Sequence, residues 1–207
     1  MKNIVAIILS TLLIAFSAHS HDQSWKYEKY DAKLVPDEIP IFDNLGEKHF
    51  MEEYEGRTIL LVFWASWCAP CVAEMTDLDL LQKDFRKLPF EVIAVSEDYL
   101  GVKVVEKFYA ENEIRHLSIF HDYKNELFSA FGVVGMPTSF IITPDGKNVG
   151  MFKGVINWHN QDVRKILLSY IAGNPEEPKN SYKDNSLNQQ ILQKKQKEQK
   201  DENKNKP

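Results

Sequence analysis

The chain has 207 residues, of which 43% are hydrophobic and 12% aromatic, so it can bury the core of one domain and still carry extensions. Its formal net charge is −5; residues 174–207 hold 8 lysines against 6 acidic residues and Lys2 adds one more positive charge, which leaves about −8 for residues 21–173. An acidic body argues against nucleic acid as the partner.

The first twenty residues have the three parts of a secretory signal peptide. Lys2 supplies a positive start, residues 4–16 are almost entirely apolar, and Ala18 and Ser20 place small residues at the −3 and −1 positions of a cleavage site after Ser20. The run is shorter than the roughly 20 apolar residues of a membrane helix. We therefore expect cleavage and a periplasmic or otherwise exported protein, with an uncleaved, membrane-tethered form as the alternative.

The globular part begins with a predicted hairpin. Residues 39–42 and 48–50 flank the turn-like Asp43-Asn44-Leu45-Gly46. Residues 58–64, TILLVFW, are a continuous apolar run typical of a central strand covered on both faces. Residues 70–86 repeat apolar positions every three or four residues, which predicts an amphipathic helix.

The later elements complete an α/β pattern. The turn signal Pro144-Asp145-Gly146-Lys147 joins the last two strands as a hairpin. The order predicts a mixed sheet with helices on both faces. Residues 174–207 are too polar to fold and are expected to be a disordered tail. The predicted elements are strands at 90–95, 117–120, 139–143 and 149–152, and helices at 102–113, 126–131 and 160–171.

Both cysteines of the chain lie in residues 63–75, FWASWCAPCVAEM. A structural disulfide between Cys68 and Cys71 would close a very short loop and add little stability. A zinc site needs about four ligands, and one CxxC supplies two. The histidines of the mature chain form no spaced pair, and none is predicted beside the cysteines; they are His21, His49, His116, His121 and His159.

A redox pair fits the context better than a structural bridge or a metal site. Cys68 lies where a strand gives way to a helix, and a helix N-terminus stabilises a thiolate, the nucleophile of disulfide exchange. Cys71 lies about one turn further on, where it can resolve the mixed disulfide. We expect Cys68 to be partly exposed and Cys71 largely buried.

The motif WCAPC after LLVFWAS, with Gly135-Met136-Pro137-Thr138 downstream, resembles the thioredoxin superfamily, and most closely its exported TlpA-like and ResA-like thiol–disulfide oxidoreductases. The resemblance covers about residues 36–172 and includes an EEYEGR segment and a TPDGK hairpin. It implies a thioredoxin fold with an added N-terminal β-hairpin. It also implies a cis peptide before Pro137 and a Pro137 loop that offers backbone groups to the substrate. From the residues alone, Pro137 could be an ordinary proline at the start of a strand.

The resulting domain prediction has four parts. Residues 1–20 form the signal peptide and residues 21–35 an N-terminal extension. Residues 36–173 form the thioredoxin-like domain, and residues 174–207 the tail.

One position departs from the cytoplasmic thioredoxins, which carry a buried aspartate six residues before the first cysteine. Here that position is Val62, so a proton acceptor must come from elsewhere. Glu74 lies three residues after Cys71 on the predicted helix, and the resemblance implies a functional glutamate at this place. The alternative is a first-turn glutamate that merely favours the helix dipole.

Two further side chains are expected at the rim where substrate docks. Trp67 precedes the first cysteine and is expected to be exposed, whereas Trp64 ends the central strand and is expected in the core. Met136 faces the same rim and is expected to tune substrate choice.

These observations predict an exported thiol–disulfide oxidoreductase that acts as a reductant, because Ala69 and Pro70 place no charge between the cysteines. The resemblance implies clients such as apocytochrome c or copper-centre assembly proteins, with a membrane thiol transporter as electron donor. One alternative is an oxidant that introduces disulfides. Another is a copper-delivery module that binds metal through both cysteines and a histidine. We expect no cofactor, no resident metal and a monomer.

Overall fold

The computed structural model describes residues 25–175; the predicted signal peptide and nearly all of the polar tail lie outside this range. One eight-stranded sheet runs in the order β1-β8-β7-β4-β5-β6-β2-β3. The strands are β1 (Lys26–Leu34), β2 (Ile41–Phe42), β3 (Lys48–His49), β4 (Thr58–Trp64), β5 (Phe90–Ser96), β6 (Phe120–His121), β7 (Thr138–Ile142) and β8 (Lys147–Lys153). The helices are the short 3₁₀ helix η1 (Met51–Tyr54), α1 (Ala69–Phe85), α2 (Val102–Glu111), α3 (Glu126–Ala130) and α4 (Gln161–Ile171).

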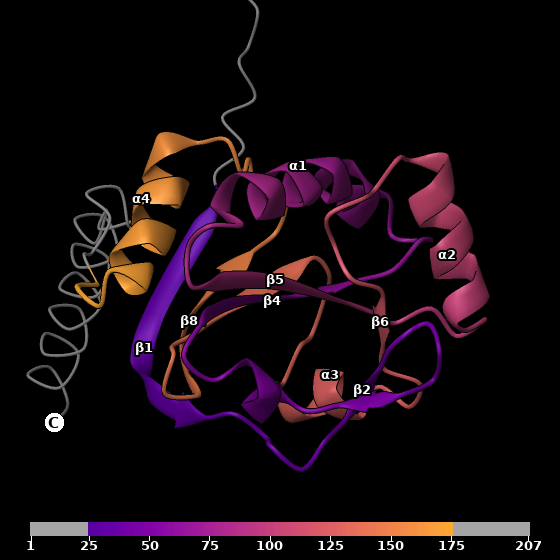
Figure 1. The fold of residues 1–207 in the computed structure, drawn as a ribbon, viewed down its shortest axis with the longest axis horizontal. Helices are drawn as coiled ribbons and strands as arrows, with labels where there is room; N and C mark the ends of the chain where they lie inside the picture. Colours follow the sequence, from indigo (N-terminus) through magenta and orange to yellow (C-terminus); the bar gives the residue numbers. More distant parts are fainter. Residues whose placement is uncertain (1–24, 176–207) are drawn as a thin grey trace, which may run out of the picture.

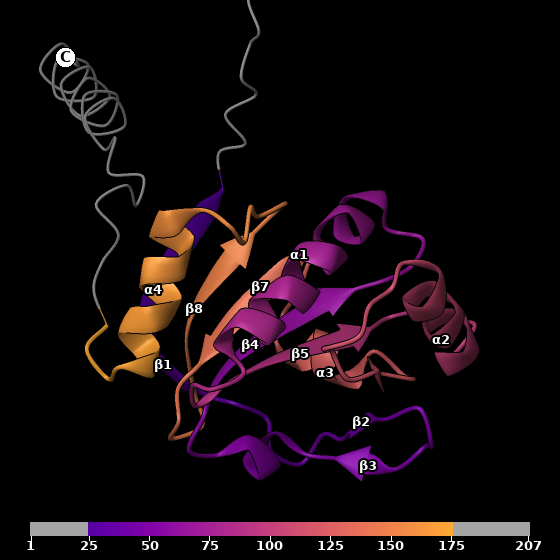
Figure 2. The same cartoon turned by 45° about the horizontal axis from the view of Figure 1, so that its top comes forward.

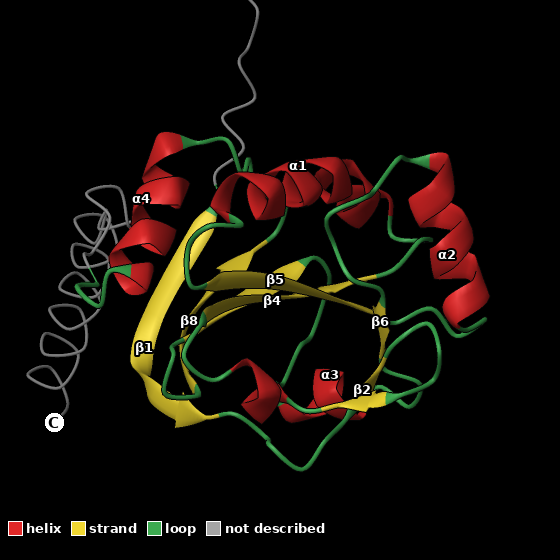
Figure 3. Ribbon diagram, in the orientation of Figure 1, coloured by secondary structure: helices red, strands yellow, loops and turns green. Residues whose placement is uncertain are grey.

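Helices cover both faces of the sheet, as the order of the elements predicts. Helices α1 and α4 lie on one face with α2 beside them, whereas α3 and η1 lie on the other (Figure 1). The same division is plain when helices and strands are coloured separately (Figure 3). Two separate apolar cores result: one contains α1, α2 and α4, and the other contains Leu127 of α3 and Met51 of η1.

Strand β4 lies in the middle of the sheet, between β7 and β5, and every one of its residues is buried. It pairs in parallel with β5 and antiparallel with β7, and its side chains alternate between the two cores. The predicted hairpin of β2 and β3 is confirmed, and Phe42 pairs with His121, so the hairpin extends the sheet beyond β6. Strand β6 covers only Phe120–His121, later and shorter than predicted.

The extension before residue 36 contains a strand that the sequence analysis did not predict. Strand β1 runs antiparallel to β8 and is the outermost strand on the side of the sheet opposite to the hairpin (Figure 2). Only Tyr27 of β1 is fully buried, so the strand lacks the alternating apolar pattern by which a half-buried strand is recognised. The Tyr27 hydroxyl lies 2.7 Å from the Tyr170 hydroxyl, and this contact joins β1 to helix α4.

Gly150 makes the close approach of Tyr27 to β8 possible. A Cβ atom at Gly150 would lie 2.7 Å from the Tyr27 hydroxyl oxygen and 2.9 Å from its ring. We expect Gly150→Ala to lower the free energy of unfolding by about 1–3 kcal/mol, the usual cost of overpacking. Urea denaturation measures this loss. Gly135→Ala is the matched control, because a Cβ there meets nothing within 4 Å; equal losses in the two variants would contradict the packing argument.

Within residues 25–175, none of the helices combines the length and the apolar character needed to cross a membrane.

Candidate active site

Four strand ends meet at one edge of the sheet and bring distant segments together. Strand β4 ends at Trp64, and its parallel neighbour β5 ends beside it at Ser96. Strand β7 begins at Thr138, which lies opposite both Phe63 and Lys153, the last residue of β8. The segments that leave or enter this edge are 65–68, 97–98, 135–137 and 154–156.

The cysteine pair lies where the chain leaves β4 and begins α1. Cys68 is the N-cap residue of α1, and its backbone N–H donates to the carbonyl of Ala65 at 3.1 Å. Pro70 occupies the first turn of the helix, where its missing N–H leaves no hydrogen bond unmade. The two cysteines form a disulfide, with their Cα atoms 5.3 Å apart. Cys68 therefore lies at the end of the helix whose free N–H groups and dipole favour a thiolate.

The two cysteines differ less in exposure than the sequence analysis expected. Cys71 is 1% exposed and Cys68 only 7% exposed, and both belong to the core shared by α1 and α4. The expectation that Cys71 is buried is confirmed. The expectation that Cys68 is partly exposed is wrong for the oxidised protein, because the disulfide holds its sulfur against the buried Cys71.

Glu74 is buried on α1, three residues beyond Cys71, with 2% of its surface exposed. It lies in the second turn, and the first turn of α1 has no acidic residue, so the alternative of a dipole-favouring first-turn glutamate is wrong. The Ile156 N–H donates to Glu74 Oε1. Burial raises the pKa of Glu74 to about 8, against the opposing effect of this hydrogen bond. A carboxyl group with this pKa can accept and release a proton near neutral pH.

The Pro137 loop enters the same edge of the sheet. The Met136–Pro137 peptide bond is cis, as the resemblance implied. Met136 is half-buried and packs against both cores. A groove of about 280 Å³ runs beside this loop. It is lined mainly by apolar side chains and backbone from residues 131–138, together with Phe140, Met151, Lys153 and Gly154.

The two tryptophans before Cys68 occupy the predicted environments. Trp64 is fully buried and packs against Phe108 and Tyr109 of α2, with ring centroids 5.0 and 6.0 Å away. Trp67 is 60% exposed next to Cys68. Val134 in the Pro137 loop is fully exposed, so apolar surface lies at more than one place around the pair.

Sequence reasoning missed two buried acidic residues at this edge. Asp98 is buried and accepts hydrogen bonds from the backbone N–H and the hydroxyl of Ser66, two residues before Cys68. Glu97 is also buried, and burial followed by the charges of Asp122 and Asp98 raises its pKa to about 9. Their position directly after the buried strand β5 was the available signal, because parallel strands end at the same edge.

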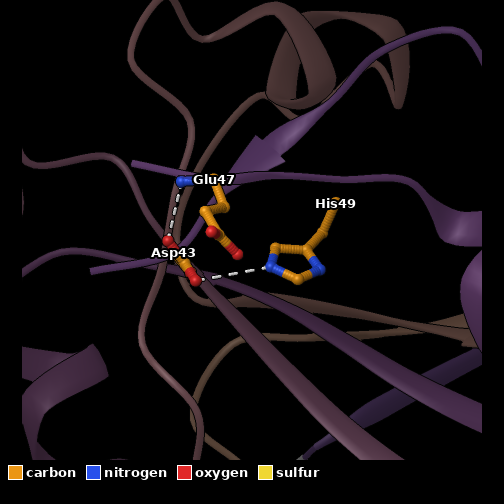
Figure 4. Close-up of side chains that lie close together, drawn as sticks. All are labelled: Asp43, Glu47 and His49. Atoms are coloured by element: carbon orange, nitrogen blue, oxygen red, sulfur yellow. Dashed lines mark hydrogen bonds and ion pairs between the residues drawn. The ribbon is translucent and has the colours of Figure 1, made fainter. Parts of the chain in front are cut away.

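Among residues 25–175, one group has ligand atoms spaced for a metal ion, and it contains neither cysteine. Asp43, Glu47 and His49 lie on the β2–β3 hairpin, with ligand atoms within 4.8 Å of one another (Figure 4). Asp43 Oδ1 accepts the N–H groups of Leu45 and Glu47, and His49 Nδ1 lies 2.9 Å from Glu53 Oε2. These contacts account for the group as the turn and ion pairs of the hairpin, several strands from β4.

A mixed sheet with helices on both faces, and a disulfide at the start of the helix after its central strand, define a thiol–disulfide oxidoreductase of the thioredoxin superfamily. Residues 31–149 match the AhpC/TSA family, and the chain belongs to that family. It is 30% identical over 135 residues to the thiol-disulfide oxidoreductase ResA of Geobacillus kaustophilus, covering 65% of this chain and 75% of the relative. Over 169 residues it is 27% identical to ResA of Geobacillus thermodenitrificans, covering 82% of this chain and 94% of the relative.

Solved structures agree with this class. A structure from Chlorobium tepidum, described as a thiol:disulfide interchange protein DsbE, aligns with a TM-score of 0.62 at 26% identity. The alignment covers 70% of this chain and 99% of that one. The expected thioredoxin fold is confirmed.

Proposed function

We propose that this protein is an exported reductant of protein disulfides, with Cys68 as the attacking cysteine and Cys71 as the resolving one. The observation that carries the proposal is the pair itself, with Cys68 capping α1 and the buried Glu74 three residues after Cys71. The predicted signal peptide and the ResA relatives support the exported location and the disulfide substrate.

The reaction consumes the dithiol form of the protein. The Cys68 thiolate attacks one sulfur of the client disulfide, which forms a mixed disulfide and releases the other client sulfur as a thiolate. Cys71 then attacks the Cys68 sulfur, so that the Cys68–Cys71 disulfide forms and the client leaves with both sulfurs reduced. Glu74 takes the proton of Cys71 as that thiol attacks. Two electrons pass from the protein to the client in each cycle.

The charges around the pair favour a reductant over an oxidant. Strong oxidants stabilise the thiolate of the first cysteine and with it the reduced form. Here Ala69 and Pro70 are uncharged, and the buried acids Glu74 and Asp98 add no positive charge. The disulfide form is thereby favoured, which makes the dithiol a donor of electrons.

Client recognition is assigned to the rim around the pair. Pro137 and Met136 belong to the loop that enters β7, the groove beside it is mainly apolar, and Trp67 is exposed next to Cys68 in the chain. An extended, partly unfolded segment suits such a surface. Apocytochrome c and copper-centre assembly proteins are the proposed clients, and a membrane thiol transporter is the proposed electron donor.

The reduction potential tests the direction of the reaction. We expect a value near or below roughly −200 mV, where reducing members of this fold operate, in a titration against glutathione or dithiothreitol. A potential close to about −120 mV would identify the protein as an oxidant instead. Stoichiometric copper in the aerobically purified protein would support the copper-delivery alternative.

A further inference from the structure

Asp98 joins the end of β5 to the loop that carries the attacking cysteine. Its carboxylate is buried, with 2% of the residue exposed. Asp98 Oδ2 accepts the Ser66 N–H at 2.8 Å, and Asp98 Oδ1 accepts the Ser66 hydroxyl at 2.6 Å. The Ser96 hydroxyl donates to Oδ2 at 2.8 Å. Both carboxylate oxygens are thus committed to donors, two of which belong to the residue two places before Cys68.

Asp98 is itself held to the sheet by its backbone. Its carbonyl accepts a hydrogen bond from His121 Nε2 at 2.6 Å, and its N–H donates to the Ser96 hydroxyl at 3.1 Å. The preceding residue, Glu97, donates its N–H to the carbonyl of Trp64 at 2.8 Å. The acid therefore sits on a rigid support formed by the ends of β4, β5 and β6.

We propose that Asp98 is a positioning residue for Cys68: through Ser66 it fixes the loop of residues 65–67, and thereby holds the Cys68 sulfur over the N-terminus of α1. The inference rests on the proposed role of Cys68 as the attacking cysteine. Only three residues separate the end of β4 from Cys68, and Cys68 is tied back to Ala65 by its own N–H. The stabilisation of a thiolate by a helix falls off within the first turn, so a small displacement of the loop changes the reactivity of Cys68.

The proposed effect can be separated from the charge of Asp98. A negative charge near Cys68 disfavours its thiolate, so removing the charge alone would make Cys68 more reactive. Loss of the loop contact acts in the opposite direction. Ser66→Ala isolates the contact, because it removes one hydrogen bond and no charge. The other buried ionisable groups of this region are Glu74, Glu97, His121 and Asp122. All four are kept in the variants, except that the control replaces Asp122.

The experiment measures the rate of Cys68 alkylation in the reduced protein across pH, with the modified cysteine identified by mass spectrometry. We expect Ser66→Ala to raise the apparent pKa of Cys68 by roughly half a unit to one unit, which slows alkylation below that pKa about threefold to tenfold. Asp98→Asn is expected to shift it less than Ser66→Ala does, because the loss of the contact and the loss of the charge act in opposite directions. The variant that carries both substitutions should be no slower than the slower single variant, because the two substitutions disrupt the same contact between Ser66 and Asp98. Ser66→Thr, which keeps the hydroxyl, should restore the wild-type profile.

Asp122→Asn is the matched control. Asp122 is a buried carboxylate in the same region, but its two oxygens accept the N–H groups of Glu126 and Phe128 at the start of α3. It should lower the melting temperature and leave the Cys68 profile unchanged. An unchanged profile in Ser66→Ala, a Ser66→Thr profile equal to that of Ser66→Ala, or an equal shift in Asp122→Asn would overturn the inference. If the wild type itself reduces no protein disulfide, the proposed function fails instead, whatever the profile.

Discussion

Cys71→Ser is expected to turn the protein into a trap for its own clients. Cys68 keeps its place as the N-cap of α1 and can still attack a disulfide, but the second thiol that would release the client is gone. Other thiols are scarce in an oxidising compartment. The variant, expressed with its natural N-terminus, should therefore accumulate covalent adducts that disappear on reduction. Non-reducing gels followed by sequencing of the trapped proteins measure this.

Cys68→Ser is the control for the trap. It leaves Cys71, which is 1% exposed and inside the first turn of the helix, where a protein disulfide cannot reach it. We expect few adducts and a loss of essentially all disulfide reduction. Clients with haem-attachment CxxCH motifs would support cytochrome c maturation, and copper-site proteins would support oxidase assembly. Equal trapping by the two variants would contradict the assigned order of attack.

Glu74→Gln is expected to slow the release of the mixed disulfide while leaving the fold intact. The glutamine keeps an oxygen that can accept the Ile156 N–H, but it cannot take the proton of Cys71. We expect the resolving step to slow about tenfold to hundredfold, at or below the low end of what a positioned acid–base group contributes, because water remains as a poorer acceptor. Stopped-flow kinetics with a protein disulfide separates this step from the initial attack. The measurement runs from roughly pH 6 to 9, because the pKa of Glu74 is about 8.

The same substitution is expected to change how stability depends on pH. The pKa of Glu74 is about 8 in the folded protein and 4.5 in its unperturbed state. Between these values the unfolded chain has lost the proton that the folded chain keeps, so the free energy of unfolding falls as pH rises from 4.5 to about 8. In Glu74→Gln this loss, on the order of 2–4 kcal/mol for the oxidised protein, should be absent. The decline due to Glu97, whose pKa burial raises to about 9, remains in both proteins, so the contribution of Glu74 is read as the difference between wild type and variant.

Asp84→Asn provides the control for both measurements. Asp84 also lies on α1, but it is half-exposed and pairs with Arg164 at 2.9 Å. Removing this surface charge should change stability by less than about 1 kcal/mol and leave the kinetics unaltered. If Glu74→Gln matches Asp84→Asn in rate and in pH dependence, Glu74 has only a structural role.

The sequence alone determined most of the helices and strands and the cysteine pair. The apolar run of β4 predicts a buried central strand because no polar face is left for solvent, and the CxxC that follows it predicts a nucleophile at a helix start. Local patterns of this kind need no knowledge of the rest of the chain. Strand β1 was missed because it has no local apolar pattern. Only Tyr27 is buried, and the residue it packs against, Gly150, is distant in the sequence.

Only the tertiary structure decided the environment of the site. Whether Glu74 sits in solvent or in a core depends on Ile156 and the layers that close over α1, and burial is what raises its pKa to about 8. The contact of Asp98 with Ser66 spans 32 positions of the chain and exists because β4 and β5 end at one edge. The exposure of Cys68 likewise follows from the core behind it. Such properties arise from desolvation and from contacts between distant segments, which residue type and spacing do not specify.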